Sequence, residues 1–146
     1  MKKIAVIITA AGSSARMGGV KKEYRPLGGC FDSGGKALTV LGAAVAAFAS
    51  VEGICCIVIT VPPGGEQAAL AALPLLPGPG RPAPPVPGKA EAPAFPGGYI
   101  RCVSGGPTRR ASVHNALAAL KSCDPAYVLI HDGARPWVDQ ALIRRA

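Results

Sequence analysis

The run IAVIITAAGSSARMGG, residues 4–19, decides the fold of this chain. Its first part, Ile4–Thr9, is continuous, apolar and rich in β-branched residues, which is typical of a short strand covered on both faces in a parallel sheet. Small residues follow at once. Ligands of open α/β sheets bind beyond the carboxyl ends of the strands. The run therefore predicts both an α/β fold and a binding loop after the first strand.

The other predicted elements alternate along the chain. Continuous β-rich runs predict strands at Ile54–Val61, Tyr99–Val103 and Tyr127–Ile130, the last of them buried. Periodicity and capping residues predict helices at about 37–50, at Glu66–Leu73, at 109–123 after a Thr108 cap, and from Gln140 after an Asp139 cap. This alternation predicts an open, mostly parallel, Rossmann-like sheet with helices on both faces.

Two stretches depart from this alternation. Residues 74–98 hold more than half of the 15 prolines and almost no large apolar side chains, so we expect an exposed, polyproline-like loop inserted into the domain. A proline-rich ligand for a partner domain is the alternative. The chain ends at Ala146, within the second turn of a predicted helix. We therefore expect residues 1–146 to be the amino-terminal part of a larger domain, with a sheet that is incomplete on the carboxyl-terminal side.

Composition narrows the class of protein. The 146 residues carry a formal net charge of +8, with 49% hydrophobic and 16% charged residues, which suits one folded domain and an anionic ligand. The longest uncharged apolar stretch, residues 37–51, falls short of the ~20 residues that span a bilayer, so we expect no membrane partner. Basic residues occur singly or in pairs and aromatic content is 5%, which argues against a nucleic-acid partner.

The cysteines bear on the compartment. Their number, 5, is odd and no CxxC spacing occurs, which argues against a zinc site and a disulfide framework. Cys55, Cys56 and Cys102 lie in apolar, strand-like runs, where a thiol behaves as a small buried group. The sequence therefore predicts a reduced, cytoplasmic protein.

The loop after the first strand is the first of four segments with chemical potential. Its small residues let backbone N–H groups approach a phosphate, and Arg16 adds a forked cation. A dinucleotide fingerprint fails because Ser14 stands where its second glycine belongs. A P-loop ending at Lys36 fails because Cys30 and Ala37 replace its glycine and its serine or threonine. An ordinary glycine turn is the remaining alternative.

The second and third segments are weaker signals on their own. Lys21 and Lys22 are placed to reach a polyphosphate, although lysine pairs are also common on solvated surfaces. The stretch GGPTRRAS, residues 105–112, leads into a predicted helix N-terminus, whose free N–H groups and dipole favour anions or base carbonyls.

The fourth segment, HDGARP at residues 131–136, is the sharpest. It places a carboxylate and a guanidinium at the carboxyl end of a strand, where Asp132 is suited to hold a Mg²⁺ that bridges phosphate oxygens. The alternative is that Asp132 and Arg135 pair only to close a turn. A hydrolase triad of Ser112, His131 and Asp132 is disfavoured, because neighbours on a strand point to opposite faces.

Together the four segments resemble a known family. The order AAG-x-x-x-R-M, K-x-Y, GG-x-x-R-x-x-S-V and HD-x-ARP is similar to that of the 2-C-methyl-D-erythritol 4-phosphate cytidylyltransferases, and ribitol-5-phosphate cytidylyltransferases share much of it. The AAG loop alone also occurs in many sugar-phosphate and molybdopterin nucleotidyltransferases. The resemblance covers the chain except residues 74–98 and a smaller insertion near residues 30–34, and it implies a nucleotidyltransferase-like form of the predicted fold.

The resemblance implies an activity and a set of site residues. The family transfers CMP from CTP to a polyol phosphate, with Mg²⁺ and release of pyrophosphate, in the non-mevalonate route to isoprenoid precursors. The matching positions form four groups: Ala10, Ala11, Gly12, Ser13 and Ser14 in the triphosphate loop; the cations Arg16 and Lys22 at the α-phosphate; Gly106 and Ser112 at the cytosine; Asp132 and Gly133 at the ribose and Mg²⁺.

The sequence departs from the family pattern at two of these segments. Ser14 stands where many members have glycine, and Pro107, which has no N–H to donate, stands where most have an acidic residue. Family members are also longer, and their second half supplies a further lysine, much of the acceptor site and an arm that exchanges across a homodimer. For this shorter chain the dimer is left open. The alternatives are another acceptor, such as ribitol 5-phosphate, and a nucleotide-binding module without turnover.

Overall fold

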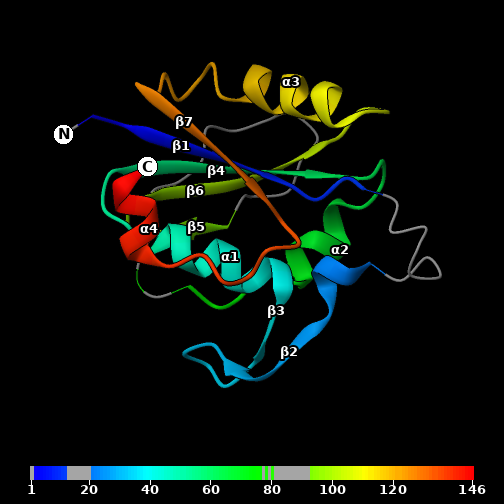
Figure 1. Cartoon of the computed structure of the whole chain (residues 1–146), viewed down its shortest axis with the longest axis vertical. Helices are drawn as coiled ribbons and strands as arrows, with labels where there is room; N and C mark the ends of the chain where they lie inside the picture. Colours follow the sequence, from blue (N-terminus) through cyan, green and yellow to red (C-terminus); the bar gives the residue numbers. More distant parts are fainter. Residues whose placement is uncertain (1, 13–20, 77, 79, 81–92) are drawn as a thin grey trace.

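A computed structural model of the chain (Figure 1) describes residues 2–12, 21–76, 78, 80 and 93–146. Five strands form one sheet in the order β5-β6-β4-β1-β7. Their bounds are Ile4–Thr9 for β1, Ile54–Val61 for β4, Ala94–Phe95 for β5, Gly98–Ser104 for β6 and Tyr127–Asp132 for β7. The pairs β1–β4, β1–β7 and β4–β6 are parallel, and only the short edge strand β5 runs antiparallel to its neighbour. The predicted parallel sheet is thus confirmed.

Helices cover both faces of this sheet, as predicted. Their bounds are Val40–Ala49 for α1, Glu66–Ala71 for α2, Arg109–Ala119 for α3 and Gln140–Arg145 for α4, with a 3-10 helix, η2, at Lys22–Tyr24. Helix α3 lies on one face, and α1, α2 and α4 lie on the other (Figure 1). The predicted caps are also confirmed, because the Thr108 and Asp139 side chains accept hydrogen bonds from the N–H groups of Ala111 and Leu142.

The two central strands form the middle of the core. All residues of β4 are buried, and side chains of β1 alternate between two apolar clusters. Ile7 packs in a cluster with Ala116 of α3, whereas Ile8 packs in the opposite cluster with Leu41 of α1. A strand clamped in this way offers a rigid support for the loop that follows it.

A hairpin that the sequence did not predict precedes α1. Strand β2 (Pro26–Phe31) pairs antiparallel with β3 (Ala37–Thr39). The helix expected at about 37–50 is therefore confirmed as α1, but it begins after this hairpin. Thr39 has an extended backbone, and its hydroxyl accepts a hydrogen bond from Gly42 N at 2.9 Å, so α1 begins at Val40. The sequence of β2 did not indicate a strand, because it contains a proline and two glycines, which are depleted in strands.

Two further expectations about exposure were wrong. Within the proline-rich stretch, Ala94 and Phe95 form β5, and Phe95 is 0% exposed, so this end of the stretch belongs to the core. Residues 77, 79 and 81–92 lie outside the described part, and their insertion into the domain stays a prediction. Strand β7, predicted to be buried, is an edge strand of the sheet among the described residues, where it pairs with β1, and Tyr127 and Ile130 are about half exposed.

The five cysteines are free, and Cys55, Cys56 and Cys102 are buried as predicted. Cys55 Sγ lies 2.8 Å from Cys123 Sγ, so the pair shares a thiol contact between β4 and the turn after α3. Burial, reinforced by this contact, raises the pKa of the Cys55 thiol to about 12. No helix in the described part of the chain is long and apolar enough to cross a bilayer.

Thr39 offers a test of the hairpin–helix junction. Its hydroxyl both caps α1 and donates to the Ala72 carbonyl at 2.8 Å, in a buried setting. We expect Thr39→Val to lower the free energy of unfolding by about 2 kcal/mol, because the cap is lost and a buried carbonyl is left unpaired. Thr108→Val removes only an exposed cap and should cost about 1 kcal/mol. Urea denaturation measures both, and an equal or smaller loss at Thr39 would contradict the buried bridge.

Candidate functional site

The loops after β1 and β7 meet at the carboxyl edge of the sheet. Gly133 N donates to the Thr9 carbonyl at 3.0 Å. A Cβ placed on Gly133 would lie 3.1 Å from Ala10 Cβ and 3.1 Å from the Thr9 carbonyl oxygen, so the absence of a side chain allows this approach. The start of the predicted phosphate loop and the HDGARP segment are therefore neighbours in space.

The turn between β6 and α3 closes on the same loop. A Cβ on Gly105 would collide with Ala11 Cβ and would lie 2.8 Å from Ser112 Oγ. Ser112, only 4% exposed, accepts a hydrogen bond from Gly106 N at 3.1 Å and donates one to the Thr108 carbonyl at 3.1 Å. The Ser112 hydroxyl thus fixes the turn, and the bare Gly105 lets the turn touch Ala11.

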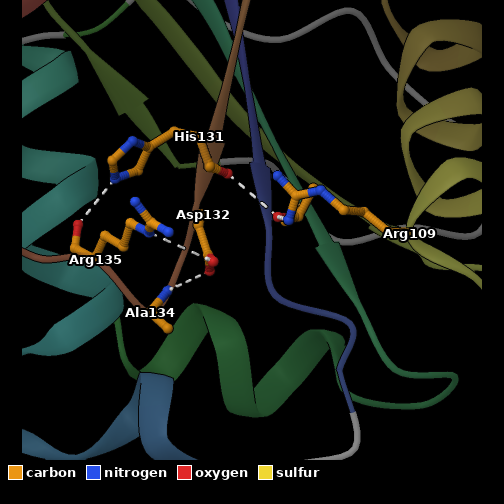
Figure 2. Close-up of polar contacts among 6 residues, drawn as sticks. Arg109, His131, Asp132, Ala134 and Arg135 are labelled. Atoms are coloured by element: carbon orange, nitrogen blue, oxygen red, sulfur yellow. Dashed lines mark hydrogen bonds and ion pairs between the residues drawn. The ribbon is translucent and has the colours of Figure 1, made fainter.

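Positive charge gathers at the start of α3. Arg109 and Arg110 occupy the first turn, which contains no acidic residue. Arg109 Nη1 donates to Thr9 Oγ1 at 3.0 Å, and Thr9 Oγ1 donates to the His131 carbonyl at 3.3 Å (Figure 2). Because the helix dipole is also positive at this end, the edge favours an anion.

Asp132 supplies a carboxylate at this edge. Its Oδ1 accepts a hydrogen bond from Ala134 N at 3.0 Å, and its Oδ2 lies 3.8 Å from Arg135 Nε (Figure 2). The pairing with Arg135 that closes the turn is thus present, but it is long, and the two side chains are 36% and 79% exposed. Such an exposed pair contributes little to stability, so Asp132 remains accessible to a ligand.

His131 takes no part in a triad. Its Nε2 donates to the Arg135 carbonyl at 2.8 Å, and its ring meets the Phe48 ring of α1 edge-on at 5.2 Å. Ser112 lies in α3 on the opposite face of the sheet, with its hydroxyl engaged in its own turn. The structure therefore does not bring these residues together as a hydrolase triad.

The two lysines separate. Lys21 Nζ donates to the Ala10 carbonyl at 2.8 Å and also to the Gly12 carbonyl, and burial lowers the pKa of this group. Lys22 begins η2 and is exposed. The second segment is therefore tied directly to the loop that follows β1.

All four segments thus meet at one edge of the sheet through described residues. The predicted residues brought there are Ala10, Ala11, Gly12, Gly106, Ser112, Asp132 and Gly133, with Lys22 one residue from Lys21. Ser13, Ser14 and Arg16 lie outside the described residues. Sequence reasoning missed Thr9. It named Lys21 with Lys22 as a pair that reaches a polyphosphate, not as a partner of the loop carbonyls, and it gave Arg109 no role of its own. A signal existed for Arg109, which stands inside the GG-x-x-R pattern, and for Thr9, the last residue of its strand.

Comparisons with known proteins identify the family of this chain. A family model described as 2-C-methyl-D-erythritol 4-phosphate cytidylyltransferase (IspD) matches residues 4–146. The chain belongs to this family. The predicted resemblance is therefore confirmed, and so is the expected nucleotidyltransferase-like fold.

Two named relatives illustrate the match. The 2-C-methyl-D-erythritol 4-phosphate cytidylyltransferase of Cereibacter sphaeroides is 37% identical over 142 residues, which are 97% of this chain and 51% of the relative. A bifunctional enzyme IspD/IspF of Anaeromyxobacter dehalogenans is 36% identical over 94% of this chain and 28% of its own length. The chain therefore spans about half the length, or less, of the curated relatives it matches.

Solved structures of IspD proteins share the fold. The 4-diphosphocytidyl-2C-methyl-D-erythritol synthase of Anaerococcus prevotii superposes with a TM-score of 0.59 and 27% identity, covering 99% of this chain and 48% of that protein. The cytidylyltransferase of Thermus thermophilus gives 0.54 and 26%, covering 98% of this chain and 47% of that protein. The family relation thus extends to the fold of the chain.

The contact between Gly105 and Ala11 can be tested by a double-mutant cycle. We expect Gly105→Ala to lower the free energy of unfolding by about 2 kcal/mol, because the new methyl group collides with Ala11 Cβ. Ala11→Gly in the same chain should recover part of this loss. Gly28→Ala, whose Cβ meets nothing within 4 Å, should stay within about 0.5 kcal/mol of the parent in the same urea titration. Strict additivity of the Gly105 and Ala11 changes would disprove the contact.

Proposed function

We propose that the protein transfers CMP from CTP to 2-C-methyl-D-erythritol 4-phosphate and releases pyrophosphate. Membership of the family supports this chemistry. The observation that carries the proposal is the meeting of the loop after β1, the Lys21–Lys22 pair, the β6–α3 turn and Asp132 at one edge of the sheet. Such an edge combines backbone donors, cations and a carboxylate, which is the set that a nucleoside triphosphate and its metal require.

Phosphate transfer of this kind needs positioning and positive charge more than covalent help from the protein. An acceptor phosphate oxygen attacks the α-phosphorus of CTP, and pyrophosphate leaves as the bond to the β-phosphate oxygen breaks. Negative charge spreads over the α-phosphate oxygens as this occurs. In the proposed arrangement Arg16 and Lys22 stabilise that charge, and the backbone of Ala10–Gly12 holds the triphosphate.

The β6–α3 turn is suited to recognise cytosine. Its Gly106 N–H is already bonded to Ser112 Oγ, and Pro107 has no N–H to offer. The backbone groups that Gly106 and Pro107 can offer to a base are therefore mainly their carbonyl oxygens, which accept hydrogen bonds. Cytosine carries an exocyclic amine that donates to such oxygens, whereas uracil carries a carbonyl at the same place. The turn thus favours CTP over UTP.

Asp132 fits a magnesium ion bound together with phosphates. Mg²⁺ is commonly held by one or two carboxylates, with phosphate oxygens and water completing its shell. Ala134 N fixes one oxygen of Asp132, and the side chain is 36% exposed, so the carboxylate is both oriented and accessible. The described residues contain no group of three His, Cys, Asp or Glu side chains that would hold a metal by themselves. Asp132 would hold such an ion, which would supply positive charge to the phosphates.

The first test is magnesium-dependent binding of CTP. We expect Lys22→Ala and Asp132→Ala each to weaken it at least about tenfold, because each removes a charged contact worth roughly 1.5–3 kcal/mol. Lys121 is an exposed lysine in the turn that follows the far end of α3, so Lys121→Ala is the matched control and should bind as the parent does. Isothermal titration calorimetry with and without Mg²⁺ gives the affinities. Equal affinities in all three variants would refute the proposed site.

The second test is the choice of base during turnover. We expect pyrophosphate release when CTP and 2-C-methyl-D-erythritol 4-phosphate are both present. When UTP replaces CTP, we expect at least about tenfold less release, because the uracil carbonyl cannot donate a hydrogen bond to the carbonyl oxygens of the β6–α3 turn. The same assay with ribitol 5-phosphate as the acceptor distinguishes the proposed activity from that of the ribitol-5-phosphate cytidylyltransferases. Release that is indifferent to the base would reject cytosine recognition by the turn.

A further inference from the structure

Lys21 joins two residues of the loop after β1. Its ammonium group donates to the carbonyls of Ala10 and Gly12, at 2.8 Å for the first. The next residue, Lys22, is the exposed cation assigned above to the α-phosphate. We propose that Lys21 is a positioning residue, which holds the Ala10–Gly12 backbone and the start of η2 in the arrangement that receives the nucleotide phosphates. This inference rests on the proposed function.

The contacts of Ala10 show what Lys21 controls. Ala10 N donates to the Thr60 carbonyl at 3.0 Å and to Thr60 Oγ1 at 3.2 Å, so β4 holds this residue from the amide side. Lys21 holds it from the carbonyl side. A trans peptide is planar, with its C=O and N–H pointing in opposite directions. The Ala11 N–H is therefore turned away from the ammonium group, and under the proposal it serves as a donor for an anion.

The position of Ala11 is determined from its other side by the β6–α3 turn. Its methyl group fills the space that a side chain on Gly105 would need. With Gly12 O also bound by Lys21, the peptide group before Ala11, the Ala11 side chain and the carbonyl of the next residue are all restrained. A loop ordered before ligand binding avoids the entropy cost of ordering on binding.

The same side chain sets the place of Lys22. Consecutive Cα atoms lie about 3.8 Å apart, so an anchored Lys21 keeps the Lys22 backbone next to the loop. Burial lowers the pKa of Lys21, and the buried Glu23 nearby acts in the opposite sense, favouring the ammonium form. The partly buried cation is thus matched by two carbonyls and a carboxylate, which is how buried charge is tolerated.

The chain provides a matched control for removing such an ammonium group. Lys36 Nζ also donates to two carbonyls, those of Ala71 at 2.7 Å and Leu73 at 3.1 Å, but it lies in the β2–β3 hairpin away from the loop after β1. Lys21→Met and Lys36→Met therefore remove the same kind of contact. Lys21→Arg keeps the charge and its donors, and Lys21→Gln keeps a donor without the charge.

Two measurements on the full chain test the proposal. We expect Lys21→Met to weaken Mg²⁺–CTP binding at least about tenfold, Lys21→Arg to stay within about threefold of the parent, and Lys21→Gln to fall between them. In ¹⁵N relaxation of the ligand-free protein, Lys21→Met should lower the order parameters of Ala11 and Gly12 from about 0.85 to below about 0.6. Lys36→Met should change neither quantity.

The outcomes separate positioning from simple attraction. Unchanged order parameters in Lys21→Met, with a loss of CTP affinity that disappears in 1 M salt, would show long-range charge only and overturn the proposal. A loss of affinity that persists in salt, with partial rescue by Lys21→Gln, supports it. Absence of CTP binding by the parent would reject the proposed function; the relaxation data would then still show whether Lys21 orders the loop.

Discussion

The parallel pairing of β1 on both sides is the constraint on which the site depends. Thr9, its last residue, is in register with Thr60 of β4 and with Asp132 of β7. Parallel strands end at the same edge, so any chain that buries Ile4–Thr9 between these partners must bring Ala10 beside Gly133 and within reach of α3. The central strand gains its stability from apolar burial on both faces, and the geometry of the edge follows from that burial. Cations and carboxylate are thereby held on rigid elements.

The sequence could predict what is decided locally. The strand β4, buried at every position, and the caps Thr108 and Asp139 depend on neighbouring residues, and their signals were read correctly. The exposure of a side chain, by contrast, depends on residues that are distant in the sequence. Phe95 stands among prolines and glycines, yet it is fully buried because β5 pairs with β6, and no pattern within residues 74–98 encodes that pairing. Strand β7 has the composition of a buried strand, but its burial depends on whether another strand lies beside it.

The candidate site shows the same division between type and role. Sequence motifs indicated which residue types belong together, because phosphate chemistry restricts them. The motifs could not assign different roles to the two adjacent lysines. Lys21 contacts the Ala10 and Gly12 carbonyls and Lys22 is exposed because of the path of the chain, which the motifs do not specify. Nor could they separate Gly105 from Gly106. The first is bare because Ala11 occupies the space beside it, whereas the N–H of the second is bound by Ser112.

The balance of charge at this edge bears on how the ligands arrive. Two arginines in the first turn of α3 oppose the helix dipole, an arrangement that costs about 0.3–1 kcal/mol each and that a bound anion reverses. Asp132 lies near Arg135 (Figure 2). Arg109 donates to Thr9, which is the residue in register with Asp132. A lone carboxylate among cations attracts a divalent ion weakly, because the neighbouring guanidinium groups repel it. A polyphosphate supplies the missing negative charge, so under the proposed function metal and nucleotide bind together, and the excess of positive charge at the edge is what makes their binding interdependent.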